Sequence, residues 1–517
     1  MMDMIPKGCF HLMDGVRLIP DDAGGMAMQL SPLRVMRVNE TAFKILEGCR
    51  EGFSIESSLP GVPFSRAKPI HSFLDSLCST HWLRWTPAEN AAPPFVSIVI
   101  PVYNRAGEIG ECLESLLRLD YPSSRREIIV VDDGSEDDTA AVVRGFEVRL
   151  IVHERNKGQS AARNAAVAVA EGEIIAFIDS DCIADPAWLQ DLAPFFQDPR
   201  IALVGGYVDS HYRDTWLDRY EDAKSPLNMG KNELICGHED SDFYVPTCNM
   251  LVRKDAYLEV GGLDESWRVG EDVDLCWKLK KQGHRLVYVP RGRVSHKHRN
   301  RFLDGFKRRF DYGVSEPVLY DRHGEVCKWF PWLPGGLLFC LSCCLGLLTM
   351  PLLFSISATS IVAAEAFQSR ARMKKANVPL TFQEIFKAVL NNFTSLGYHL
   401  SLHIVRYYFL LILPLTLLFP SAILLSTVLV LLAPTVEYVR RKPRLPFPLF
   451  LSFFLMEQTF YQTGVFTSCL KTRSFRCYRL RFKGVRRSRL QSDRVFPRVV
   501  DFILKRWRGQ ALGRQRQ

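Results

Sequence analysis

Apolar runs alternate with amphipathic segments between residues 95 and 179. The runs FVSIVIPVY, REIIVVD and EIIAFID are almost continuously apolar, as in strands that are buried on both faces of a sheet. The intervening GEIGECLESLLRL and SAARNAAVAVA have apolar residues at helical spacing. This order predicts an α/β domain with a mostly parallel sheet, whose ligands bind beyond the carboxyl ends of the strands.

A smaller unit precedes this domain, over residues 8–88. Strand-like pieces and helix candidates alternate there, at 16–19, 26–30, 34–38, 40–49 and 69–79. They predict a small α+β module. The proline-containing stretch TPAENAAPP, residues 86–94, has no apolar period and predicts a linker, so the second domain is expected to cover 93–300.

Charge-free apolar stretches dominate the chain after residue 330. Residues 332–364 and 407–436 carry no formal charge, and each stretch is long enough to cross a hydrocarbon core of about 30 Å. Residues 447–470 are a third candidate for a membrane helix. Glu457 and its polar neighbours weaken that candidate, and a buried or interfacial helix is an equal alternative. The pattern predicts a connector at 301–330, membrane-associated helices at 331–470 and a tail at 471–517.

The connections around these stretches are all basic. They cover 297–328, 370–387, 440–444 and the tail. Under the positive-inside rule, they cannot all be cytoplasmic if each stretch crosses once. Because Pro351, Pro414 and Pro420 interrupt the stretches, re-entrant or tilted hairpins are favoured over two to four ordinary spans. With either topology, the α/β domain is expected on the cytoplasmic face of a bacterial inner membrane.

The formal net charge of +10 is unevenly distributed, since residues 471–517 hold about sixteen Lys and Arg against two Asp. Such a tail favours an anionic surface as partner, and the adjacent apolar stretches favour lipid over nucleic acid. The 14 cysteines show no zinc-like spacing, and the first residues contain no apolar signal segment. Reduced cysteines and a cytoplasmic soluble part are therefore expected.

Acidic residues follow two of the predicted strands. Asp132 and Asp133 close IIVVDDGS, and Asp179 and Asp181 close IIAFIDSD. Any one of these residues could be only a turn former or a helix cap. Together, at the mouth of a parallel sheet, they suit a hard divalent cation such as Mg²⁺ or Mn²⁺ that is shared with phosphate.

Five segments occur in the order typical of one enzyme family: SIVIPVYN, VVDDGSEDDT, ERNKGQSAARNAA, AFIDSDC and GGLDESWRVGEDVDLCWKLKKQG. With them the chain resembles the family 2 glycosyltransferases over about two fifths of its length. The resemblance implies a GT-A fold with a mixed, mostly parallel sheet. It also implies that a nucleotide sugar is held by Pro101, Tyr103, Asp132 or Asp133, Arg163 and Asp179, and that Asp181, with Asp179, binds the metal.

An acceptor hydroxyl must lose its proton as it attacks, so a carboxylate is needed beside it. Asp272 is the candidate base, with Glu271 orienting it or the acceptor. The alternative is that both are only N-terminal acids of the helix predicted from DVDLCWKLKK. Asp274 is expected to be a solvated helix acid. His296 and His298 are candidate metal or diphosphate ligands, with a solvent-facing strand end as the equal alternative.

A narrower resemblance rests on YVPTCNMLVRKDAYLEVGGLDESWRVGEDVDLCWKLKKQG, SHKHR, YGVSEPVLYDRH and GVRLIPDDAGGMAMQLSPLRVMRVNETA. These segments are similar to those of mycofactocin-system glycosyltransferases. The resemblance implies transfer of glucose from UDP-glucose, through a β-linkage and with further sugars added, to a small peptide-derived redox cofactor. The N-terminal module resembles the winged-helix-like peptide-chaperone domain of pyrroloquinoline quinone biosynthesis, which implies a pathway protein partner or an added packing domain.

Two other functions stay open. The first is a membrane glycosyltransferase with a lipid or polysaccharide acceptor, although the Gln-x-x-Arg-Trp string of processive synthases is absent from the sequence. The second is a non-catalytic scaffold that only binds nucleotide sugars. Such a scaffold is expected to lose the metal carboxylates or the base, and Asp179, Asp181 and Asp272 are all present.

Overall fold

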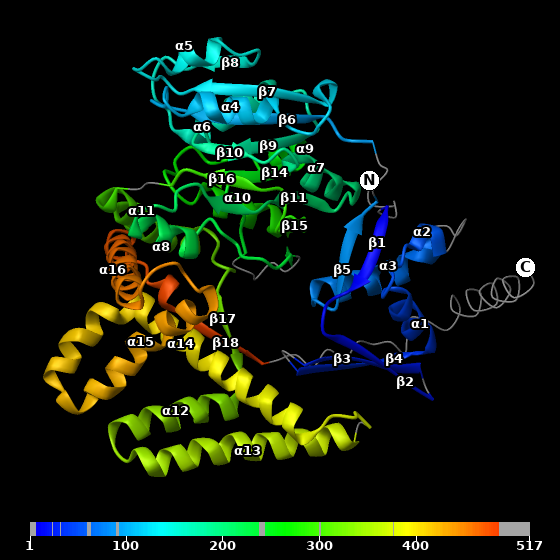
Figure 1. Ribbon diagram of the computed structural model, residues 1–517, viewed down its shortest axis with the longest axis vertical. Coiled ribbons are helices and arrows are strands. Elements are labelled where there is room, and N and C mark those ends of the chain that lie inside the picture. Colours follow the sequence, from blue (N-terminus) through cyan, green and yellow to red (C-terminus); the bar gives the residue numbers. More distant parts are fainter. Residues whose placement is uncertain are drawn as a thin grey trace, which may run out of the picture.

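The computed structural model describes residues 7–22, 24–30, 33–58, 64–88, 92–236, 243–298, 301–375 and 377–484. An α/β domain lies at one end of the long axis, a helical part lies at the other end, and the N-terminal module lies beside them (Figure 1). Most of the predicted basic tail, residues 485–517, lies outside the described residues.

An eight-stranded sheet forms the core of the α/β domain, in the order β13-β15-β11-β14-β9-β6-β7-β8. Its strands are β6 (Val96–Val102), β7 (Arg126–Asp132), β8 (Arg149–Val152), β9 (Ile174–Ile178), β11 (Ile201–Gly205), β13 (Leu234–Cys236), β14 (Asn249–Arg253) and β15 (Arg285–Tyr288). β8, β7, β6 and β9 are parallel, whereas β14 runs antiparallel between β9 and β11. The predicted mixed, mostly parallel sheet is therefore confirmed, and the inserted β14 was not predicted.

Helices cover this sheet, and a small second sheet extends it. The helices are α4 (Ile109–Leu117), α5 (Thr139–Arg144), α6 (Gln159–Val169), α7 (Trp188–Leu192), α8 (Trp216–Lys224), α9 (Lys254–Glu259) and α10 (Glu271–Lys281). The second sheet has the order β10 (Cys182–Ala184), β16 (Val294–His296), β12 (Val208–Ser210). Every residue of β6 and β9 is buried, which explains why their sequences are apolar without alternation.

The N-terminal module contains the predicted strands and helices. They are β2 (Val16–Asp21), β3 (Gly24–Leu30), β4 (Leu33–Asn39), α1 (Glu40–Gly48) and α3 (Phe64–Ser79), and a short helix, α2 (Ile55–Ser58), was not predicted. The Asn39 side chain accepts a hydrogen bond from the Ala42 N–H and so caps α1. A further pair, β1 (Gly8–Leu12) with β5 (Leu83–Pro87), brings the two ends of the module together.

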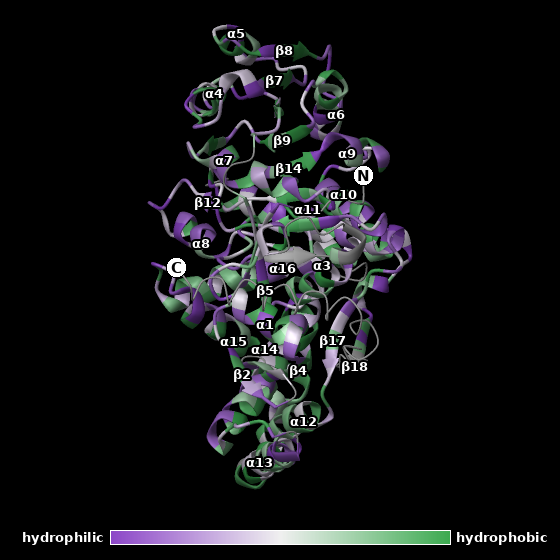
Figure 2. Ribbon diagram, turned by 90° about the vertical axis from the view of Figure 1, so that its right-hand side faces the viewer, coloured by the Kyte–Doolittle hydropathy of each residue, from purple (hydrophilic) through white to green (hydrophobic). Residues whose placement is uncertain are grey.

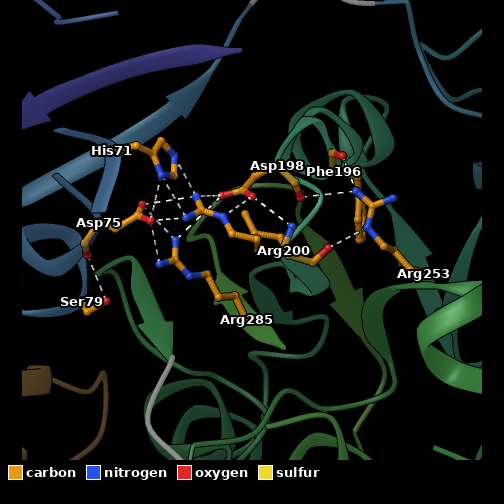
Figure 3. A network of polar contacts seen from close by, with 9 residues as sticks. His71, Asp75, Ser79, Phe196, Asp198, Arg200, Arg253 and Arg285 are labelled. Carbon is orange, nitrogen blue, oxygen red and sulfur yellow. Dashed lines mark hydrogen bonds and ion pairs between the residues drawn. The ribbon is translucent and has the colours of Figure 1, made fainter. Parts of the chain in front are cut away.

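A network of charged side chains joins this module to the sheet domain (Figure 3). Asp75 of α3 forms ion pairs with Arg200 and with Arg285, the latter at 3.0 Å, and Arg200 also contacts Asp198 at 2.6 Å. Burial opposes the charge of Asp75, but the His71 hydrogen bond and the Arg285 charge outweigh it and lower the pKa of Asp75. The module is thus held in place by a carboxylate that stays ionised.

The predicted connector 301–330 is mainly a long helix, α11 (Phe302–Arg322), followed by β17 (Lys328–Trp332). α16 (Phe447–Thr472) packs closely against it. A Cβ atom on Gly313 would lie 2.2 Å from the Tyr461 carbonyl oxygen, and one on Gly464 would lie 2.2 Å from that of Phe310. One face of the 447–470 helix is therefore buried against α11, which favours the alternative of a buried helix.

The two charge-free stretches are each divided by a turn. Residues 332–364 form α12 (Pro334–Leu348) and the start of α13 (Pro351–Lys375), and residues 407–436 end α14 (Phe382–Leu418) and begin α15 (Ile423–Arg441). Among the described residues, Leu352–Lys375 and Pro420–Arg441 are long and apolar enough to cross a membrane. Figure 2 shows hydrophobic residues along α12 and α13 at the lower end of the molecule.

The chain after α16 returns to the connector, because β18 (Leu480–Gly484) pairs in parallel with β17. Cys477 in this segment is fully buried. The first part of the predicted tail is therefore structured.

Candidate functional site

The site lies at the carboxyl ends of β6, β7 and β9, where the parallel sheet predicted it. Pro101 is buried within β6 opposite Val131, and Tyr103 follows the strand with 41% of its surface exposed. Asn104 adopts a left-handed conformation with φ of 52°, and its side chain accepts the Glu136 N–H at 2.8 Å. The loops after β6 and β7 are thereby tied into one rim beside Tyr103.

The two acids after β7 shape this rim. Asp132 accepts the Ser135 N–H at 2.9 Å. Asp133 accepts the Lys157 and Gly158 N–H groups at 3.0 and 2.7 Å, and it also contacts His153 at 2.7 Å. Both acids are almost completely buried. Asp133 therefore holds the loop that leads into α6. The predicted contact between Asp133 and the nucleotide stays a prediction.

Arg163 joins two parts of the site that lie far apart in the sequence. From α6 it donates to the Asp179 carboxylate at 2.6 Å and to Glu271 at 3.3 Å, and its side chain is only 1% exposed. Burial opposes its charge, but Asp179 and Glu271 outweigh that cost and raise the pKa of Arg163. A permanent cation thus fixes the loop after β9 to the start of α10.

α10 begins with both predicted acids at the site. Gly270 precedes it with a φ of 92°, a left-handed conformation that favours glycine. Burial raises the pKa of Glu271, and burial together with the Glu271 charge raises the pKa of Asp272 to about 7. A carboxyl group with this pKa can take up and release a proton near neutral pH, as a general base must.

A candidate metal centre is formed where β10 pairs with β16. The register places Cys182 opposite His296, and the ligand atoms of Asp181, Cys182 and His296 lie within 4.8 Å of one another. Burial keeps the pKa of the Cys182 thiol well above its usual value. The Asp181 carboxylate and the His296 imidazole, 3.6 Å apart, fit a divalent cation that takes oxygen and nitrogen ligands.

His298 does not join this group. One of its ring nitrogens contacts the Ser210 hydroxyl at 2.9 Å, and the other contacts Asp218 at 3.1 Å. Both nitrogens are occupied, so the structure corrects the expectation that His298 is a ligand: its side chain fixes α8 to the strand end instead.

Asp274 also differs from its prediction as a solvated acid. It is fully buried, bonded to His323 at 2.9 Å, and paired with Lys278 at 2.7 Å. The prediction was wrong because His323, which directly follows α11, lies against this side of α10, and helical spacing alone could not show that contact.

Two residues of the site were missed by the sequence analysis. Gln159 donates to Glu271 at 2.6 Å, and its spacing of four from Arg163 on α6 was a usable signal. Arg308 of α11 is the other. Burial opposes its charge, but Tyr312, Glu271 and Asp272 raise its pKa, which places this cation near both acids. No local pattern connects residue 308 to residue 272.

Comparisons with known proteins indicate the family to which the chain is similar. Residues 97–261 match the family model of glycosyl transferase family 2. The chain is 36% identical over 234 residues to the pre-mycofactocin glycosyltransferase of Mycobacterium tuberculosis, covering 44% of this chain and 48% of that protein. It is 33% identical over 203 residues to the glycosyltransferase AglE of Haloferax volcanii, covering 38% and 64%. The matched regions thus span about half to two thirds of the length of these relatives.

One solved structure is a mannosyltransferase from Pyrobaculum calidifontis in complex with GDP-Man and Mn²⁺. It matches with a TM-score of 0.44 and 16% identity, over 75% of this chain and 90% of that one. At this level of similarity, its bound ligands are not transferred to the present chain.

Proposed function

We propose that this family 2 glycosyltransferase is an inverting, metal-dependent enzyme that moves glucose from UDP-glucose to a hydroxyl group of pre-mycofactocin. The observation that carries the proposal is the link made by Arg163 between Asp179, at the expected donor edge of the sheet, and Glu271, next to the half-buried Asp272. This link supports a single site that holds both the donor and the proton acceptor.

The donor nucleotide would lie along the rim of the sheet. Tyr103 offers an exposed ring beside Asp132, and Asp179 keeps 29% of its side chain exposed for a ribose hydroxyl. Asp181 and His296 would hold Mg²⁺ or Mn²⁺, with the imidazole favouring Mn²⁺. A cation bound there supplies positive charge for the diphosphate as it departs.

Asp272 serves as the base in a single displacement. Its carboxylate takes the proton of the acceptor hydroxyl while that oxygen bonds to the anomeric carbon. The bond from that carbon to the diphosphate breaks, and its electron pair leaves with UDP. Because attack and departure occur on opposite faces, the α-linked donor gives a β-linked product. Glu271, held by Gln159 and Arg163, limits the movement of its neighbour.

The identity of the acceptor rests on the relative that is 36% identical. A membrane-associated position is supported by the two apolar helices. The N-terminal module would bring a pathway partner to the enzyme, a role for which its attachment through Asp75 is suited.

The test uses full-length protein, UDP-glucose, Mn²⁺ and pre-mycofactocin. The expected product is heavier by one or more hexoses and β-linked by NMR, and the matched Asp272→Asn variant gives none. Transfer to extracted lipids but not to pre-mycofactocin would contradict the acceptor. Mn²⁺-dependent UDP binding with no transfer to either acceptor would contradict the assignment as an enzyme of this reaction.

A further inference from the structure

The C-terminal part contains two helical hairpins whose turns are apolar and exposed. In the α12–α13 hairpin, Met350 is 64% and Leu352 is 77% exposed, and in the α14–α15 hairpin, Leu417 is 83% and Phe419 is 60% exposed. The two helices long enough for a membrane are only 22% and 17% buried. The two helices are therefore not core helices of the described structure. The turns of both hairpins lie on the same side of the molecule, at the left of Figure 1.

In each hairpin arm, the part of the helix that carries no charge is short, and its length is nearly the same in all four arms. Measured from the turns, the arms are 334–348, 351–364, 407–418 and 423–436, with 15, 14, 12 and 14 residues. At 1.5 Å per residue these arms reach roughly 18 to 22 Å. A hydrocarbon core is about 30 Å thick. All four helical arms could pass one leaflet, but none is long enough as a charge-free helix to cross the bilayer.

Charged residues close each hairpin at its base. Glu365 lies beside Gly335, where a Cβ would be 3.4 Å from the Glu365 carboxylate, and Glu437 pairs with Arg441. Exposed cations follow at the same end of the helices: Arg370, Arg372, Lys374, Lys375, Arg440, Arg441, Lys442 and Arg444. Their charge complements anionic lipid headgroups.

Two pairs of hydroxyl groups inside the apolar arms are bonded to each other, which favours their placement in lipid. Ser342 donates to Ser357 across the first hairpin at 2.9 Å, and Thr416 donates to Ser426 across the second at 2.7 Å. These bonds hold each pair of arms together where water is absent.

We infer that both hairpins enter a lipid bilayer from one side and return to it, with the turns at 348–353 and 417–424 near the middle of the bilayer. The basic connections then all stay on the side of the transferase domain, which removes the conflict with the positive-inside rule. β6 runs from the linker toward the side on which the turns lie (Figure 1). The candidate site at its carboxyl end therefore lies on that side of the sheet domain. This inference goes beyond the proposed reaction and does not depend on it.

The test is the access of a membrane-impermeant maleimide to Met350→Cys and Leu417→Cys in full-length protein. The protein is placed in sealed vesicles of phosphatidylcholine and phosphatidylglycerol, and reagent is added outside or trapped inside. Mass spectrometry of the peptides that contain residues 350 and 417 keeps the native thiols from interfering. Glu114→Cys, whose side chain is 59% exposed on α4, is the matched control that reports the transferase side.

Both turn cysteines are expected to react from neither side, to less than about a tenth of the control, and to react fully after detergent is added. Reaction from the side opposite to Glu114→Cys would show hairpins that cross the membrane. Reaction from the same side as Glu114→Cys would show that the turns lie in water or against a soluble partner. Either result would overturn the inference, and since no transfer activity is read, failure of the proposed reaction leaves the test intact.

Discussion

Replacement of Asp272 by Asn is the sharpest perturbation of the proposed site. The Asp272 Oδ1 atom accepts the Val273 N–H at 2.8 Å, a bond that the Asn amide oxygen can keep. The start of α10 should therefore survive, and only the ability to take a proton is lost. Loss of a general base lowers kcat by about 10² to 10⁴. UDP-glucose affinity should stay within a few fold, because no donor contact is assigned to this side chain.

The pH profile of the unmodified enzyme gives a second measure of the same group. Burial, and then the Glu271 charge, raise the pKa of Asp272 from 3.8 to about 7. Catalysis needs the ionised carboxylate, so kcat/KM should rise with pH up to about 7 and then level off. About a tenth of the sites carry the carboxylate at pH 6, so the rate should fall about tenfold per unit below the pKa.

Steady-state transfer between pH 5 and 9 measures both effects, with Asp255→Asn as the matched control. Asp255 is likewise a first-turn acid, on α9, so this variant loses a similar interaction with the helix dipole away from the site. Unchanged turnover in Asp272→Asn would remove the residue from the mechanism. A product that retains the α configuration of the donor would exclude single displacement altogether.

Three other outcomes are expected. Asp181→Ala should abolish Mn²⁺-dependent UDP binding, measured by titration calorimetry on protein shown to be folded by circular dichroism, and retained affinity would refute the metal assignment. Asp75→Ala should lower the free energy of unfolding by about 2 kcal/mol and speed proteolysis of the linker, because Arg200 and Arg285 lose their shared partner. Truncation after residue 484 keeps the buried Cys477. This truncation should weaken binding to anionic vesicles at low salt by several kcal/mol, because each basic group in contact with the lipid contributes about 1 kcal/mol. An equal loss at high salt would refute electrostatic attachment.

The helical part shows where prediction from the sequence stopped. The charge-free stretches were evident, and the prolines indicated where they could turn back. Pro420 does begin the segment after the second turn, whereas Pro414 lies inside α14. The close contact of α11 with α16 was not predictable, because it depends on Gly313 and Gly464, which lie about 150 residues apart and match no local signal.

The sequence by itself determined β6, β7 and β9 of the α/β domain, the acids at the carboxyl ends of β7 and β9, and the first turn of α10. Local periodicity and the rule that ligands bind at strand ends are sufficient for these features. Only the tertiary structure decided which of these side chains are free to act. It engages Asp133 and His298 in internal hydrogen bonds, buries Asp274 under α11, and raises the pKa of Asp272. The physical reason is that burial and the contacts with distant residues decide whether a side chain is charged and whether it can bind a ligand. The residues that provide this burial and these contacts lie in segments far apart in the sequence, which local spacing does not connect.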